Sequence, residues 1–195
     1  MTRSDMTLAR KAMIDSQLRT SGVNEAFVLS RMGAVAREDY VPEHAKDIAY
    51  MDRAIPLGDE RYLAAPLVHG MMLVEAMPRS EERALIVESG SSYLTDLSRP
   101  LVDVLDTISA DDAVGGKPGR KKYSLVLVDG AIEELPENLA KSVEEGGRVV
   151  AGVISNGVTR LASGKKIGGA IVLQPFAEIG IPVLKQFAKP KEWSF

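Results

Sequence analysis

One short turn, Ser89-Gly90-Ser91-Ser92 after Glu88, contains residue types that could hold an anionic group. It follows the apolar run at residues 84–87, which is typical of a strand buried on both faces. A glycine in such a turn lets the backbone approach a ligand closely, and N–H groups at the start of a following helix can point at a negative charge. The turn therefore permits a small anionic ligand, although it could equally just connect a strand to a helix.

Two further side chains could do chemistry near such a turn. Asp129 follows the apolar strand expected at residues 124–128 and stands at a carboxyl end, where ligands gather in parallel sheets. It could equally cap the turn at Gly130. His69 is a lone histidine on an expected helix, so a structural role and a role at a site both remain open.

Composition excludes several kinds of chemistry. The 195 residues include no cysteine, which excludes disulfides, thiolate nucleophiles and zinc–thiolate sites. His44 and His69 are the only histidines, so we expect no metal site. The net charge of −3 argues against a nucleic-acid partner, and the one basic cluster, residues 117–122, is typical of a solvated loop.

We expect no membrane partner either. No apolar run reaches membrane-spanning length. The first 15 residues are interrupted by charges and contain no signal-peptide core, which predicts a cytoplasmic protein.

The first half of the chain reads as helical. A helical stripe predicts a helix from Met6 to about residue 20, ended by Gly22. Asn24 is a good N-cap for a second helix, which must end before Pro42. Residues 45–65 look irregular, and Pro66 then opens a third helix at a position where its missing N–H costs nothing.

From about residue 83 strands and helices alternate, which predicts a parallel sheet with helices on its faces. We expect one domain over residues 1–195, with a helical extension and loop region at 1–80 and the sheet core at 81–195. Near the end, a Gly-Lys-Lys-Ile-Gly-Gly turn predicts an antiparallel hairpin. The expected strands are residues 84–87, 102–108, 124–128 and 149–154, the helix is 136–143, and the hairpin strands are 157–162 and 170–176.

Several segments resemble the protein-L-isoaspartate O-methyltransferase family in order and spacing. The family implies an α/β Rossmann-like methyltransferase fold that binds S-adenosylmethionine and methylates the carboxylate of damaged aspartyl residues. The matching segments are residues 13–19 (Met-Ile-Asp-Ser-Gln-Leu-Arg), 40–43 (Tyr-Val-Pro-Glu), 49–52 (Ala-Tyr-Met-Asp), 55–58 (Ile-Pro-Leu-Gly), 123–130 and 145–150.

The cofactor turn departs from the pattern that the resemblance implies, which is an acidic residue, one spacer and three glycines at alternate positions, followed closely by a tyrosine. Tyr93 matches that tyrosine. Aligned without a gap, Glu88 replaces the first glycine, Gly90 is the second and Ser92 replaces the third. Shifted by two, Glu88 is the acidic residue and Gly90 the first glycine, but Ser92 and Leu94 replace the others. In the first alignment a carboxylate about 4 Å from that of the cofactor costs roughly 4 kcal/mol.

The middle of the chain is too short for the family's second strand, helix and third strand. Asp106 could be the carboxylate that holds the ribose hydroxyls, or the same strand could be the third one, with Asp111 or Asp112 on the adenine side. A helix and a strand are therefore expected to be missing. Residues 110–122, rich in Gly, Lys and Asp, are expected to form a mobile loop.

The substrate loop also departs from the family. The family has a serine or threonine two residues before the proline that opens the third helix, and here Ala64 occupies that position. Alanine has no side-chain donor or acceptor. His69 matches a residue near this place in some family members.

Together these residues predict a degenerate, shortened family member that keeps the fold, binds no cofactor and acts as a non-catalytic scaffold or interaction protein. The alternative is an active S-adenosylmethionine-dependent protein carboxyl O-methyltransferase whose pocket a partner subunit completes. Because the deletion exposes a sheet edge, a homodimer or another protein partner is expected. Trp193 and Phe195 form a tail that is either docked or part of an interface.

Overall fold

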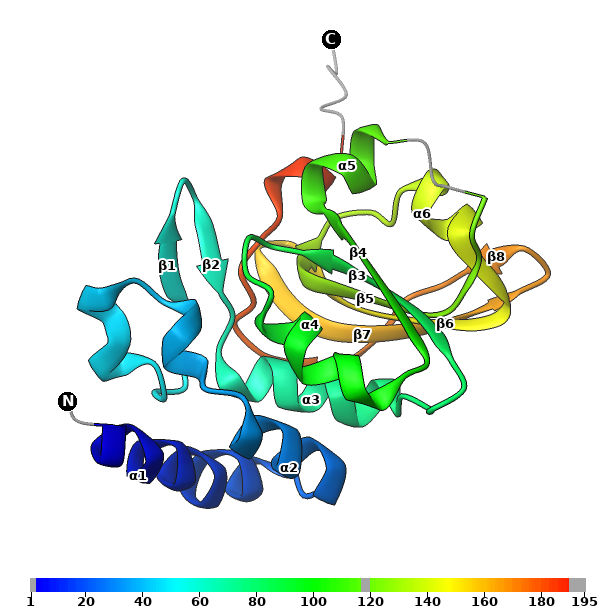
Figure 1. Cartoon of the computed structure of the whole chain (residues 1–195). Helices are drawn as coiled ribbons and strands as arrows, with labels where there is room; N and C mark the ends of the chain where they lie inside the picture. The colour runs from blue at the N-terminus through cyan, green and yellow to red at the C-terminus, as the bar shows by residue number, and fades with distance from the viewer. Residues whose placement is uncertain (1–2, 117–119, 190–195) are drawn as a thin grey trace, which may run out of the picture.

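The computed structural model describes residues 3–116 and 120–189. A seven-stranded sheet is flanked by helices, and a two-stranded hairpin lies to one side of it, beside the N-terminal helices (Figure 1). The predicted tail with Trp193 and Phe195 lies outside the described residues, as does part of the basic cluster at residues 117–122.

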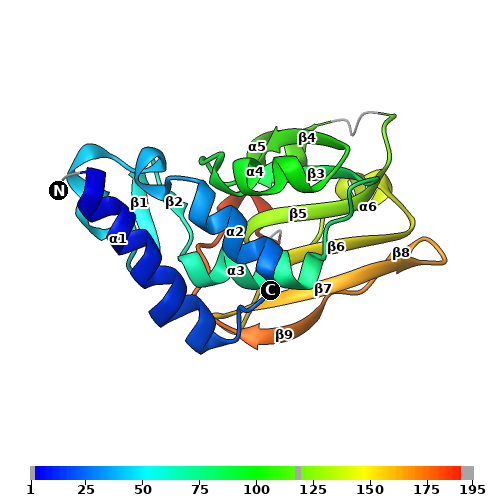
Figure 2. The ribbon, with the colours of Figure 1, turned by 60° about the horizontal axis from the view of Figure 1, so that its bottom comes forward.

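The main sheet has the order β4-β3-β5-β6-β7, with β8 and β9 both paired to β7. The first four strands in this order are parallel, and β7 runs antiparallel to β6, β8 and β9. In Figure 2, β4 and β9 lie at opposite margins of the sheet. The strands are β3 (Arg83–Glu88), β4 (Val104–Ser109), β5 (Tyr123–Ile132), β6 (Val143–Ser155), β7 (Val158–Ile167), β8 (Ala170–Ile171) and β9 (Gln174–Glu178).

This arrangement confirms the mostly parallel α/β sheet that is shortened in its middle. The chain between β3 and β5 contains one strand, β4, and that strand pairs directly with β3. The expected C-terminal hairpin is present as the β7–β9 pair, in which Leu161 faces Ala177. The structure adds an antiparallel β6–β7 pair, because the chain also reverses at Asn156 and Gly157.

The N-terminal helices follow the predicted stripes with adjusted boundaries. α1 (Arg3–Met13) continues through a π-helical turn (Ile14–Leu18) and a 3₁₀ turn (Arg19–Ser21), and the helical path ends at Gly22 with φ of +91°. α2 (Ala26–Ala34) begins after Glu25 rather than after Asn24. Two further 3₁₀ turns, Arg37–Tyr40 and Glu43–Ile48, lead toward the hairpin.

The stretch expected to be irregular contains the hairpin of β1 (Ile55–Gly58) and β2 (Arg61–Leu63). Its turn places Asp59 and Glu60 in left-handed conformations, with φ of +49° and +58°. Tight hairpin turns of this kind usually contain Asn-Gly or Asp-Gly, and Asp-Glu gives no such signal. α3 (Pro66–Ala76) follows, with Pro66 at its start as predicted.

Short helices cover the ends and faces of the sheet. The expectation of a mobile loop from residue 110 is wrong for its first part, because α5 occupies residues 110–115. Ser109 caps this helix by accepting a hydrogen bond from the backbone N–H of Asp112 at 3.1 Å. The short helical elements are α4 (Tyr93–Ser98), α5 (Ala110–Gly115), α6 (Glu137–Ser142) and 3₁₀ turns at Arg99–Leu101 and Lys185–Phe187.

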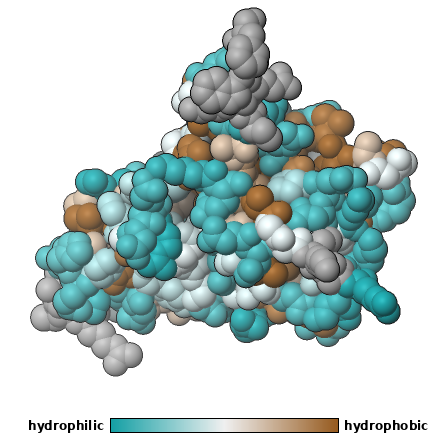
Figure 3. Space-filling view, turned by 90° about the horizontal axis from the view of Figure 1, so that it is seen from above, coloured by the Kyte–Doolittle hydropathy of each residue, from teal (hydrophilic) through white to brown (hydrophobic). Residues whose placement is uncertain are grey.

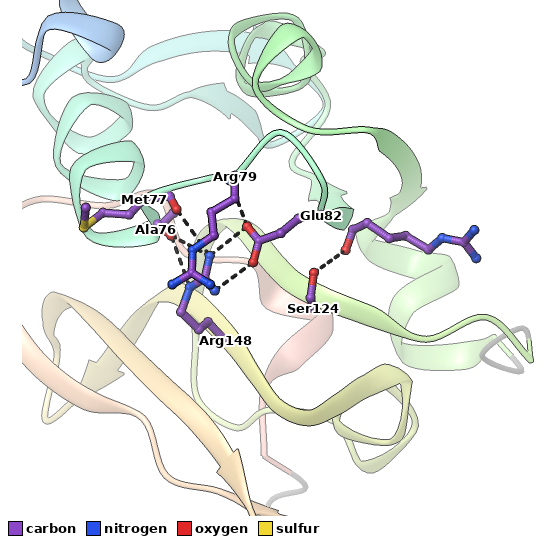
Figure 4. Close-up of polar contacts among 7 residues, drawn as sticks. Ala76, Met77, Arg79, Glu82, Ser124 and Arg148 are labelled. Carbon is purple, nitrogen blue, oxygen red and sulfur yellow. Dashed lines mark hydrogen bonds and ion pairs between the residues drawn. The ribbon is translucent and has the colours of Figure 1, made fainter.

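Arg148, at the start of the buried part of β6, joins three elements (Figure 4). Its guanidinium binds both carboxylate oxygens of Glu82 and donates to the carbonyl of Ala76, which ends α3. The backbone N–H of Arg79 also donates to Glu82, at 2.9 Å. This contact ties the end of α3 to the start of β3.

Candidate functional site

The candidate site lies at the carboxyl edge of the parallel strands. β3 ends at Glu88 directly opposite Ser109, the last residue of β4, and Asp129 lies near the same edge on β5. The turn at residues 89–92 follows β3 and leads into α4. This edge is where ligands bind in open parallel sheets.

Three predicted residues meet beneath this edge. Asp129 lies between His69 and Ser89: its Oδ1 is 2.9 Å from His69 Nε2, and its Oδ2 accepts a hydrogen bond from Ser89 Oγ at 3.1 Å. All three side chains are buried, and Asp129 is 1% exposed. Because Ser89 is bonded to the carboxylate and not to the imidazole, the arrangement does not activate the serine as a nucleophile.

Arg37 and Tyr93 complete this polar group. Tyr93 corresponds to the tyrosine that follows the family's cofactor turn, whereas no sequence pattern pointed to Arg37. Arg37 is fully buried, donates to the carbonyls of Ala49 and Ala64, and holds its guanidinium 5.1 Å above the ring of Tyr93. Burial is the largest influence on Arg37 and lowers its pKa, while Tyr93 and Asp129 act in the opposite direction. Asp129 therefore supplies negative charge to a buried cation.

The polar groups of the turn are used within the protein. Glu88 accepts a hydrogen bond from Thr95 Oγ1 at 2.6 Å, and Ser92 Oγ donates to Asp96 at 3.2 Å. Gly90 has φ of +109°, and a Cβ added there would lie 2.5 Å from Cδ of Arg61. The open face of the glycine is thus covered by a side chain from β2.

A C-terminal segment, residues 181–187, crosses the same edge. Ala131 donates its N–H to the carbonyl of Pro182 at 2.8 Å and accepts from the N–H of Leu184 at 2.9 Å. Leu184 packs so closely on Gly130 that an added Cβ would lie 2.5 Å from its Cγ. The segment, drawn red in Figure 1, lies beside α5, and Lys185 forms an ion pair with Glu60. No sequence motif indicated this contact.

The space that remains at the edge is a cavity of about 260 Å³. Its charged lining includes Arg61, Lys185, Glu88 and Asp111. Arg61 pairs with Asp59 and Lys185 with Glu60, so both cations already have carboxylate partners. Seen from this edge, the described surface is mostly hydrophilic, with hydrophobic residues in separate groups (Figure 3).

The predicted substrate position lies nearby. Ala64 is buried, and its carbonyl accepts a hydrogen bond from Arg37. The next residue, Ala65, lines a separate cavity of about 620 Å³ together with Tyr62 and Ile181.

Asp106 is not brought to this edge. It lies midway along β4, where Lys121 Nζ is 3.0 Å from both of its carboxylate oxygens and the hydroxyl of Tyr123 donates to it at 3.0 Å. The hydrogen bond from Lys121 is the main cause that lowers the pKa of Asp106. Asp111 and Asp112 lie in the first turn of α5, and Asp111 lines the small cavity.

Residues 3–116 and 120–189 contain no cluster suited to a metal ion and no membrane-spanning helix. Within these ranges no three acidic or histidine side chains lie close enough together to hold a metal ion. Nor does any described helix have the length and apolar character needed to span a bilayer.

The fold is that of a Rossmann-like methyltransferase. The family model described as "Protein-L-isoaspartate(D-aspartate) O-methyltransferase (PCMT)" matches residues 8–109, more than half of the chain. The chain belongs to this family, which confirms the resemblance.

Two relatives illustrate the similarity. The chain is 29% identical over 172 residues to "Protein-L-isoaspartate O-methyltransferase 2" of Anaeromyxobacter sp., covering 76% of this chain and 71% of the relative. It is 26% identical to "Protein-L-isoaspartate O-methyltransferase" of Methanoculleus marisnigri, covering 91% and 92% of the two chains. The second alignment spans 203 positions, more than this chain has, so the relative contains inserted residues within it.

A solved structure agrees on the fold. A Plasmodium falciparum crystal structure, described as a protein-L-isoaspartate O-methyltransferase in complex with S-adenosyl-L-homocysteine, superposes with a TM-score of 0.74 at 20% identity. The superposition covers 91% of this chain and 98% of that one. The family match ends at Ser109, the last residue of β4.

Proposed function

We propose that this chain is a non-catalytic member of the isoaspartyl methyltransferase family, which keeps the fold as a scaffold and does not bind S-adenosylmethionine. The observation that carries the proposal is that the carboxyl edge is filled from within the chain. Residues 181–187 cross it on one side, and Arg61 covers Gly90 on the other.

The residues at the edge do not fit the cofactor. The cavity of about 260 Å³ is smaller than the roughly 300–1,000 Å³ typical of pockets for drug-sized ligands. Gly90, the one glycine left in the turn, has its open face against the Arg61 side chain rather than against free space.

Electrostatics also disfavour the cofactor's carboxylate. Glu88 lines the cavity, whereas its two cations, Arg61 and Lys185, are already paired. A second carboxylate about 4 Å from Glu88 would cost roughly 4 kcal/mol, which corresponds to nearly a thousandfold in affinity.

The substrate side supports the same proposal. Ala64 is buried and offers no side-chain hydrogen bond where the family has a hydroxyl. Asp129 is buried between His69 and Ser89, so it balances charge in the core and is not available to a ligand.

One observation favours the alternative, an active carboxyl methyltransferase completed by a partner subunit. The cavity of about 620 Å³ beside Tyr62 and Ala65 is large enough for part of a peptide. Methyl transfer depends mainly on positioning, so the missing hydroxyl alone does not exclude activity.

The test is thermal unfolding with and without millimolar S-adenosylhomocysteine, using a family relative with three loop glycines as the positive control. A ligand at a hundred times its dissociation constant adds about 2.7 kcal/mol, which raises the Tm of a chain this long by about 5–11 °C. We expect the relative to shift and this chain not to shift. A shift of that size here, followed by methyl transfer to an isoaspartyl peptide, would establish the alternative.

A further inference from the structure

The outer edge of β4 has features of an interface. Within the described residues, β4 pairs with β3 alone, in an unbroken register from Arg83–Val104 to Glu88–Ser109. Exposed edge strands are normally protected by prolines, bulges or lysines. The strand itself reads Val-Leu-Asp-Thr-Ile-Ser and has none of these, and its one charge, Asp106, is paired with Lys121.

We infer that β4 pairs antiparallel with β4 of a second copy of this chain, so that the two sheets become one across a two-fold axis. A two-fold axis perpendicular to the sheet joins the equivalent faces of the two sheets into one continuous face. Residues that lie opposite one another across the β4–β4 pair therefore point to the same face. This inference depends on the geometry of β4 and holds whether or not the chain binds a cofactor.

The side chains select the register. An axis at Asp106 would place two carboxylates directly opposite each other, which is unfavourable. An axis at Thr107 pairs the two threonines, places Leu105 opposite Ser109 and keeps residues 105–109 paired. Thr107 is exposed, so its side chain is free to meet its copy.

The charges at the two ends of β4 fit a second copy in this orientation. The exposed Arg83 and Arg99 lie at its amino end, where Arg99 also pairs with Asp96 and the exposed Asp103 offsets part of the charge. The exposed Asp111 and Asp112 lie at its carboxyl end, in the first turn of α5. Antiparallel pairing brings the basic end of one copy to the acidic end of the other, which favours this partner over an unrelated strand.

The absence of cysteine makes a cross-linking test clean. In the inferred register the two Thr107 Cα atoms are about 4.5–5.5 Å apart, within the range that a disulfide bridges. Thr107→Cys should therefore form a covalent dimer under mild oxidation. Gln174→Cys, on the opposite edge strand β9, is the matched control and should not.

Light scattering on the unmodified chain gives the second readout. We expect a dimer at micromolar concentration. Thr107→Lys should raise the dissociation constant on the order of tenfold, because it places two lysines directly opposite each other across the two-fold axis. Gln174→Lys should leave it unchanged, and circular dichroism should confirm that both variants fold. A monomer at about 100 µM, a dimer insensitive to Thr107→Lys, or cross-linking through Gln174→Cys instead would each overturn the inference.

Discussion

Arg148 holds both carboxylate oxygens of Glu82, with Nη1–Oε1 and Nη2–Oε2 distances of 2.8 and 2.9 Å (Figure 4). The same guanidinium donates hydrogen bonds to the carbonyl of Ala76, the last residue of α3. Arg148 belongs to the Glu-Gly-Gly-Arg segment that carried part of the family resemblance. Its contacts give that arginine a structural role that does not depend on any ligand.

Replacing Arg148 with alanine should destabilise the fold by about 3 kcal/mol, because Glu82 would remain buried without its partner. Glu82 is 6% exposed. Urea unfolding measures the change, and Arg160→Ala is the control: Arg160 pairs with Glu178 near the surface and should cost less than about 1 kcal/mol. Equal losses in the two variants would contradict the assignment.

Asp129→Asn should cost about 2–4 kcal/mol, because it removes the negative charge near buried Arg37 and disturbs the bonds to His69 and Ser89. Ser89→Ala removes one of those hydrogen bonds and should cost about 1 kcal/mol. Chemical denaturation of each variant would measure these two changes in the free energy of unfolding. If Asp129→Asn were neutral, Asp129 would not be the charge partner of the core.

Leu184→Ala should cost about 2–3 kcal/mol, because the side chain is 7% exposed and packs on Gly130. Its neighbour Val183 is 41% exposed, so Val183→Ala is the matched control and should cost less than half as much. Hydrogen exchange at the Ala131 amide, which donates to Pro182, should accelerate in the leucine variant only. Similar costs for the two variants would mean that the segment does not dock.

Lys121→Gln should raise the pKa of Asp106, which the hydrogen bond from Lys121 lowers in the folded chain. A lowered folded-state pKa stabilises the fold above the unfolded pKa of about 3.9 and loses that effect as pH falls through the folded value. The variant should therefore be less stable by about 0.5 kcal/mol near neutral pH and match the parent at about pH 2. A carboxylate titration followed by NMR measures the pKa, and an unchanged value would contradict the contact.

Local patterns were sufficient for the elements that depend on neighbouring residues. The apolar runs predicted β3, β4 and β5, and Pro66 marked the start of α3. They failed where the signal was weak. The Asp59-Glu60 turn contains no glycine, and α5 lies within residues 110–122, which their composition predicted to be a loop.

Individual residues of the candidate site could be predicted from the sequence, but the contacts between them could not. His69, Ser89 and Asp129 were each recognised, but their meeting depends on pairing between segments 40 and 60 residues apart. Tyr93 was recognised only as the tyrosine after the turn, and Arg37 was not recognised. A buried arginine is identified by the carbonyls and the ring around it, and tertiary packing determines those contacts.

The bridge between Ala131 and Val183 also has a consequence for the order in which the protein can form. Residues 181–187 follow all the strands of the main sheet in the chain, so they can cover the edge only after every strand has been made. Until Leu184 arrives, the backbone groups of Ala131 can be satisfied only by water or by another molecule. A chain that ends before residue 181 would therefore contain every strand and still leave this part of the carboxyl edge uncovered.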